Sequence, residues 1–162
     1  EILLQQVLAM AQLRRHEQVW DLYCGTGTLA LNFARHCHRV CGIDSVAAAI
    51  ADATANARRN RIHNATFMTG QTEYLLPRLR HQNRITADVV VLDPPRKGCE
   101  PAVLHCVAAL RPRAIVYVSC DPATLARDTA VLGQQGYLVQ AAQPVDMFPH
   151  TVHIETVTLL TA

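Results

Sequence analysis

The sequence predicts an α/β fold in which a doubly wound, mostly parallel sheet of seven strands carries helices on both faces and ends in an antiparallel strand. Strand-like and helix-like segments alternate along most of the chain, which is the pattern of repeated βα units. Residues 89–92 (VVVL) form a continuous apolar run, as expected of a strand buried on both faces. Two strand-like segments close the chain without a helix between them, so we expect them to pair antiparallel.

The individual elements follow from periodicity and from end signals. Apolar residues recur at helical spacing from Ile2 onward, and small alanines in 46–60 permit a helix to pack closely on a sheet. Pro122 stands at a first helical position, where its missing N–H is not needed. The predicted helices cover residues 2–14, 28–36, 46–60, 73–80, 101–110 and 122–134, and the predicted strands cover 18–23, 39–43, 66–69, 88–92, 114–118, 137–146 and 152–160.

Length and composition indicate one globular domain over residues 1–162. Half of the residues are hydrophobic and 17% are charged, which is sufficient for a buried core. A net charge of +2 is far from the strongly basic balance of a free-standing nucleic-acid binder. The sequence has no membrane-spanning apolar run, no signal peptide and no initiator Met. We therefore expect a cytoplasmic monomer that belongs to a longer protein.

Cysteines and basic residues each form patterns that could carry a site. The six cysteines include no C-x-x-C pair, and we expect free thiols in a reducing compartment. Residues 35–41 (RHCHRVC) match no standard zinc spacing, so no metal site is predicted. Two arginine-rich clusters, at 58–61 and 78–84, are interpreted as solvated helix ends.

A glycine-containing turn follows the first predicted strand. Gly25 and Gly27 in residues 21–30 (DLYCGTGTLA) permit a tight turn and a close approach of the backbone to a ligand. Asp44 ends the next strand, where its carboxylate can accept hydrogen bonds from both ribose hydroxyls of an adenosine cofactor. These residues leave a dinucleotide and S-adenosylmethionine open, and the Asp21 loop favours the second.

Two further motifs follow the fourth and fifth predicted strands. Prolines in residues 93–98 (DPPRKG) stiffen the loop that holds Asp93 at the strand end. Arg96 stands where amino-methyltransferases of this fold carry an aromatic residue, which disfavours an exocyclic amine as the target and suggests phosphate contacts. Cys120 lies between a buried strand and a helix, so we expect the positive end of that helix to stabilise its thiolate.

The turn into the last predicted strand contains a carboxylate in an apolar setting. Strand alternation places His153, Glu155 and Val157 on one face and Val152 and Ile154 on the other. Glu155 is therefore a candidate general base whose pKa is tuned by its surroundings.

Together the four motifs resemble the signature set of the RNA uridine-5-methyltransferase family. The match comprises residues 21–28 (DLYCGTGT), 93–98 (DPPRKG), 119–128 (SCDPATLARD) and 146–155 (DMFPHTVHIE), in order over essentially the whole chain. The resemblance implies a Rossmann-like methyltransferase fold, S-adenosyl-L-methionine as cofactor and tRNA or rRNA as substrate. It implies Cys120 as the nucleophile and Glu155 as the base, with a cofactor and base pocket formed by Tyr23, Gly25, Thr28, Asp44, Gln71 and Asp93. Asn stands in many members where this chain has Thr28 and Asp121.

Such an enzyme adds a thiolate to carbon 6 of uracil, which makes carbon 5 nucleophilic enough to accept a methyl group. A base then removes the proton from carbon 5. Three alternatives remain: a cytosine-5 RNA methyltransferase, a nicotinamide-dependent oxidoreductase and a non-catalytic RNA-binding module. The first typically has Cys where Pro95 stands, and the second leaves the motifs around Cys120 and Glu155 unexplained.

Overall fold

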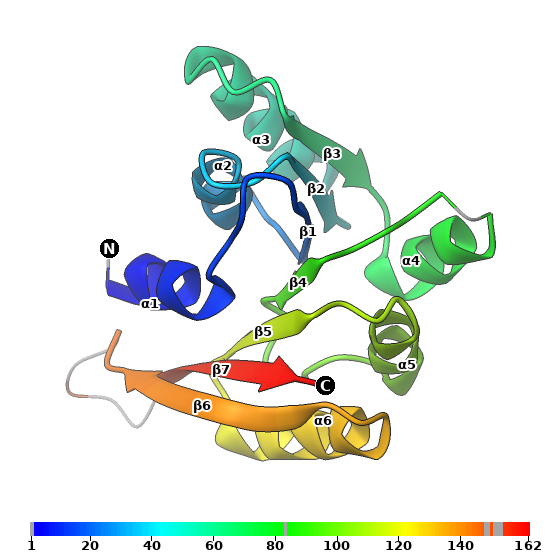
Figure 1. The fold of residues 1–162 in the computed structure, drawn as a ribbon. Coiled ribbons are helices and arrows are strands. Elements are labelled where there is room, and N and C mark those ends of the chain that lie inside the picture. Colours follow the sequence, from blue (N-terminus) through cyan, green and yellow to red (C-terminus); the bar gives the residue numbers. More distant parts are fainter. Residues whose placement is uncertain (1, 83, 148–149, 151–153) are drawn as a thin grey trace.

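A computed structural model describes residues 2–82, 84–147, 150 and 154–162 of the chain, and it contains the expected seven-stranded sheet (Figure 1). The strand order is β3-β2-β1-β4-β5-β7-β6. The first five strands pair in parallel, and β7 pairs antiparallel with both β5 and β6. The strands are β1 (Gln18–Leu22), β2 (Arg39–Asp44), β3 (Ala65–Thr69), β4 (Val89–Leu92), β5 (Ala114–Ser119), β6 (Leu138–Val145) and β7 (Glu155–Thr161).

Six helices cover the two faces of the sheet, so that α1, α2 and α3 lie on one face and α4, α5 and α6 on the other (Figure 1). Alternate strand residues point into the two resulting cores, because successive side chains of a strand face opposite ways. The helices are α1 (Ile2–Ala11), α2 (Thr28–Phe33), α3 (Ala47–Arg59), α4 (Thr72–His81), α5 (Pro101–Ala109) and α6 (Pro122–Gln134).

The central strands are the most deeply buried part of the molecule. All four residues of β4 and all six of β5 are buried. At the rim, seven of the eight β6 residues are exposed. Each helix of the described segments is too short or too polar to cross a membrane. All six cysteines are free, and the described residues contain no group of three or more His, Cys, Asp or Glu side chains able to hold a metal ion.

Helix α1 is shorter than predicted, because it ends at Ala11 and not at residue 14. Gln12 adopts a left-handed backbone conformation with φ of 43°, which terminates the helix. Arg113, from the start of β5, donates from Nη2 to the carbonyls of Ala11 and Gln12 at 3.0 Å each. A distant cation therefore caps the carboxyl end of α1, and helical periodicity contains no signal for such a cap.

Two other boundaries also differ from the prediction. Helix α2 ends at Phe33 and not at residue 36, and the last strand begins at Glu155 and not at residue 152. Val152 and His153, which the alternation pattern included, lie outside the described residues. The remaining boundaries agree with the prediction within one or two residues, which is the ordinary uncertainty of element ends.

The cap on α1 depends on a buried ion pair. Glu17 is 2% exposed, and its Oε2 accepts from Arg113 Nη2 at 2.8 Å and from the backbone N–H of Arg14 at 2.8 Å. Arg113→Met removes the main cationic partner and leaves a buried carboxylate without compensation. We expect a loss of about 3 kcal/mol in the free energy of unfolding, measured by urea denaturation. Arg59→Met, at an exposed helix position, is the control, and an equal loss in both variants would contradict this role.

Candidate functional site

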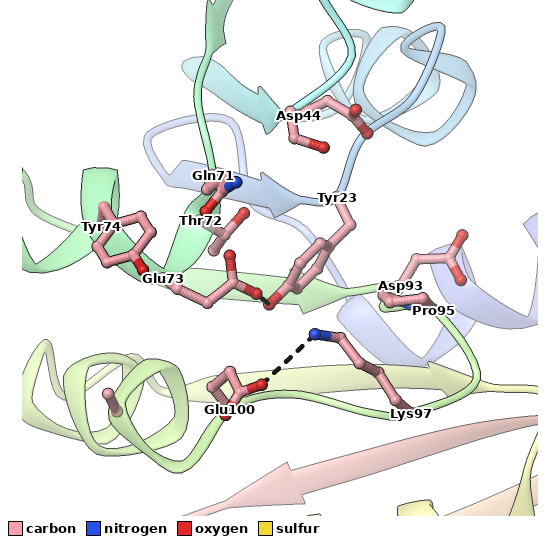
Figure 2. A pocket seen from close by; sticks show the side chains of 12 residues that line it. Tyr23, Asp44, Gln71, Thr72, Glu73, Tyr74, Asp93, Pro95, Lys97 and Glu100 are labelled. Carbon is pink, nitrogen blue, oxygen red and sulfur yellow. Dashed lines mark hydrogen bonds and ion pairs between the residues drawn. The ribbon is translucent and has the colours of Figure 1, made fainter.

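The carboxyl ends of the parallel strands open into a cavity of about 730 Å³ (Figure 2). Four of the predicted cofactor residues line it, namely Tyr23, Asp44, Gln71 and Asp93. They follow or end β1, β2, β3 and β4, and the parallel register brings these strand ends to one edge of the sheet. The structure therefore gathers most of the predicted cofactor residues around one space.

Gly25 and Thr28 lie outside the wall of that cavity. The N–H of Gly25 donates to Asp44 Oδ2 at 2.8 Å, so the glycine turn orients the Asp44 carboxylate, which lines the cavity. Asp44 Oδ1 accepts from the N–H of Val46 at 2.8 Å, and each oxygen keeps a further lone pair. Thr28 begins α2 and lines a separate polar hollow between α2 and α3 together with Asn56. Direct cofactor contact by Gly25 and by Thr28 stays a prediction.

Sequence reasoning missed the acidic side chains on the far wall of the cavity. Glu73, in the first turn of α4, accepts from the Tyr23 hydroxyl at 3.1 Å (Figure 2). Lys97 brings a positive charge, but its Nζ pairs with Glu100 at 3.4 Å across the cavity mouth. A carboxylate in the first turn of a helix usually interacts with the helix dipole, so Glu73 gave no separate indication of a role in a site. Its position two residues after Gln71 was the one sequence feature that placed it near the cavity.

Asp21 is a buried carboxyl behind the cavity. It is fully buried near the end of β1, and its Oδ2 accepts from the backbone N–H of Ala30 at 2.9 Å, while Oδ1 has no hydrogen-bond partner among the described residues. Burial, together with the nearby carboxylates of Asp93 and Asp44, raises the pKa of Asp21 to about 8. Asp21 therefore holds the amino end of α2 to β1 and carries a proton near neutral pH.

Asp93 stands at the junction between the cavity and the end of β5. Its pKa is raised to about 6, mainly because the crevice removes water from the carboxyl and secondly because Glu155 is close. Glu155 is half-buried at the start of β7, and burial raises its pKa while the nearby Arg96 guanidinium opposes that rise. Two carboxyl groups with raised pKa values thus share one strand-end crevice.

The antiparallel register brings Cys120 and Glu155 to the same end of the β5–β7 pair. Val118 pairs with Val157 and Ser119 with Thr156, where the ladder ends; Cys120 follows Ser119, and Glu155 precedes Thr156. A half-exposed thiol and a half-buried carboxyl therefore flank the last β5–β7 pair.

The first N–H groups of α6 are bound by the residue after Cys120, and stabilisation of the Cys120 thiolate by this helix end stays a prediction. Asp121 is the N-cap residue, and its Oδ1 accepts from the N–H groups of Ala123 at 2.8 Å and Thr124 at 3.0 Å. These donors hold the Asp121 carboxylate and lower its pKa. An acidic residue directly before Pro122 is a strong capping signal, which the sequence contains at Asp121.

The two arginine clusters lie away from the crevice. Arg58 and Arg59 occupy the last turn of α3, and Arg78, Arg80 and His81 occupy the last turn of α4. Both helices run antiparallel to the strands, so their last turns lie near the opposite edge of the sheet. The interpretation of both clusters as helix ends agrees with this placement.

The raised pKa of Asp21 makes folding stability depend on pH. Between the ordinary carboxyl pKa and about 8, the folded state binds a proton that the unfolded state has released, so the free energy of unfolding falls as pH rises. We expect Asp21→Asn to reduce this slope between pH 4 and pH 8, as measured by urea denaturation across that range. An unchanged slope in the variant would show that Asp21 is not the titrating group.

Comparison with known proteins supports one family. The family model for tRNA (uracil-5-)-methyltransferase matches residues 2–162. Uncharacterized RNA methyltransferases of Listeria innocua and Clostridium tetani are each 48% identical over 99% of this chain. The chain spans 35% of the length of each of these relatives.

Solved structures agree with the sequence comparison. The tRNA (uracil-54, C5)-methyltransferase of Pyrococcus abyssi, in complex with S-adenosyl-L-homocysteine, has a TM-score of 0.81 and 32% identity. That match covers 97% of this chain and 37% of the other. A precorrin-6y C5,15-methyltransferase of Geobacter metallireducens has the same TM-score at 14% identity, covering 99% of this chain and 88% of the other, and shows a shared fold. The chain therefore belongs to the tRNA (uracil-5-)-methyltransferase family.

Proposed function

We propose that this chain carries the cofactor site and the reacting groups of an enzyme that transfers a methyl group from S-adenosyl-L-methionine to carbon 5 of a uridine in RNA. The observation that carries the proposal is that Cys120 and Glu155 flank the last pair of β5 and β7, Ser119 with Thr156, next to the cavity that Asp93 lines. Family membership supports the reaction type. RNA as partner, a monomeric state and a cytoplasmic location belong to the same proposal.

The charge of the cavity fits this cofactor. Asp44, Glu73, Asp93 and Glu100 line it, against the single cation of Lys97, which is paired with Glu100. Acidic walls suit the ammonium and sulfonium groups of S-adenosylmethionine and repel the pyrophosphate of a nicotinamide dinucleotide. The oxidoreductase alternative is disfavoured on this ground.

Individual roles follow from the positions of the side chains. Asp44, held by the N–H groups of Gly25 and Val46, would accept hydrogen bonds from the ribose hydroxyls. Gln71 lies next to Asp44 on the same wall and would contact the adenine (Figure 2). Asp93 would orient the cofactor amine or the uracil edge. The bound cofactor supplies an electrophilic methyl group.

The covalent chemistry belongs to Cys120 and Glu155. The Cys120 thiolate forms a bond to carbon 6, and the electron pair of the carbon 5–carbon 6 double bond moves toward carbon 4, so that an enolate forms. Carbon 5 then takes the methyl group, and S-adenosyl-L-homocysteine is left as the second product. Glu155 removes the remaining proton from carbon 5, the double bond re-forms, and the bond from carbon 6 to the Cys120 sulfur breaks. The target base must leave its stack to reach this crevice.

Glu155 has the environment that this step requires. Half-burial raises the pKa of its carboxyl, which strengthens it as a base, while Arg96 favours the charged form. The Glu155 carboxylate is also close enough to raise the pKa of Asp93. A cytosine-5 enzyme could use the same pair, but Pro95 occupies the place where such enzymes typically carry a second Cys.

Variants of Cys120 and Glu155 should fail at different steps, which an assay with the full-length protein, RNA and labelled methyl donor can distinguish. We expect Cys120→Ala to abolish methyl transfer, whereas Cys106→Ala, at a buried thiol on α5, serves as the matched control and retains it. Glu155→Gln should reduce turnover by about 10²–10⁴-fold and accumulate a methylated RNA–protein adduct, because proton removal is blocked. Denaturing gels detect the adduct. Turnover by Cys120→Ala would disprove the covalent mechanism.

A further inference from the structure

One face of α6 makes hydrogen bonds to the loop that follows β4, residues 93–100, and we call this set of contacts the grip. Thr124, Arg127 and Asp128 stand at helical spacing on this face, toward the loop. Thr124 Oγ1 donates to the carbonyl of Arg96 at 3.1 Å, and Arg127 Nη2 donates to the carbonyl of Lys97 at 2.8 Å. Two successive backbone groups of the loop are therefore fixed by side chains of one helix.

Asp128 completes the grip from inside the protein. It is 1% exposed, and its Oδ2 accepts from the backbone N–H of Cys99 at 2.8 Å and from the Tyr117 hydroxyl on β5. Its Oδ1 accepts from Arg127 Nε at 2.8 Å. A buried carboxylate that receives several donors, one of them charged, makes strong and directional contacts. Asp128 thereby joins α6, the loop and the central sheet.

The loop approaches α6 so closely that only glycine fits at its nearest point. Gly98 has φ of +75°, and a Cβ atom there would lie 2.5 Å from both Arg127 Nη2 and Asp128 Oδ2. The N–H of Gly98 donates to the carbonyl of Pro95 at 2.8 Å and closes a tight turn. The loop is thus held from within by this turn and from outside by α6.

We propose that Thr124, Arg127 and Asp128 are positioning residues for methyl transfer, an inference that rests on the proposed function. The gripped loop carries Asp93 and Arg96, and α6 begins directly after Cys120 and its capping residue. Fixing the loop on α6 therefore fixes Asp93 and Arg96 relative to the nucleophile. Since small misplacements of reacting groups cost large factors in rate, loosening this grip slows attack by Cys120.

The cofactor cavity shares Asp93, Pro95 and Lys97 with this loop, so it depends on the grip only in part. Tyr23, Asp44 and Gln71 come from other elements and keep their own hydrogen bonds or backbone positions when α6 loses its hold on the loop. A positioning role therefore predicts a large effect on the rate of covalent attack and a small effect on cofactor affinity. If these residues served folding alone, neither the rate of covalent attack nor the cofactor affinity would change, once both are expressed per folded molecule.

The test uses the full-length protein with 5-fluorouridine-containing RNA, in which carbon 5 carries no removable proton and the covalent adduct persists. We expect Arg127→Met to form adduct at least about 10-fold more slowly than the wild type, with affinity for S-adenosylhomocysteine, measured by calorimetry, within about threefold. Arg127→Lys keeps a cationic donor and should recover part of the rate. Arg58→Met, an exposed arginine on α3, should match the wild type.

Several results would overturn the inference. Adduct formation by Arg127→Met at the wild-type rate would show that the grip does not position the nucleophile. Asp128→Asn, which keeps the shape of the side chain, provides a second variant for the same comparison. A parallel loss of adduct rate and cofactor affinity, or a loss that follows the unfolded fraction, would assign a structural role. Absence of adduct in the wild type would instead disprove the proposed function, and the positioning role with it.

Discussion

The antiparallel insertion of β7 between β5 and β6 is the constraint on which the site depends. Were β7 parallel to β5, Glu155 would begin at the opposite edge of the sheet, far from Cys120. Because the strand runs the other way, its first residue lies at the end of the sheet where Cys120 follows β5. Burial of β5 and of Val157 on β7 fixes the register, since a shift by one residue would move Val157 out of the core. The hydrophobic core thus determines which β7 residue comes to this end of β5.

Two regions of different charge lie beside Cys120 and Glu155, namely the cavity and the surroundings of Arg96. The cavity beside β1, β2 and β4 is acidic, which suits a cationic methyl donor. Arg96 acts on Glu155 and on Asp121 at the other side of the crevice. Asp93 lies between the two regions, with its pKa raised by lost hydration and by Glu155. In the proposed reaction, the cationic methyl donor would lie on the acidic side of Asp93 and Cys120 on the side of Arg96.

The sequence predicted the sheet, the strand-end crevice and the principal residues because each depends on local patterns. Continuous apolar runs such as 89–92 indicated the central strands, and the lack of a predicted helix between the last two strands indicated the antiparallel pair. Contacts between residues far apart in the chain leave no such local pattern and could not be predicted. The cap of α1 by Arg113, the bond from Tyr23 to Glu73 and the grip of α6 on the loop each join residues far apart in the chain. Asp121 directly before Pro122 is a local capping signal, and its carboxylate caps the start of α6.

The most direct test of this account identifies the residue that becomes bonded to RNA. The full-length protein would be incubated with 5-fluorouridine-containing RNA and methyl donor, digested, and analysed by mass spectrometry of the nucleotide-bearing peptide. The account predicts a methylated fluorouridine attached to the peptide that contains Cys120. Attachment at another cysteine, or methylated product from ordinary uridine RNA without any trapped peptide, would contradict the covalent role of Cys120.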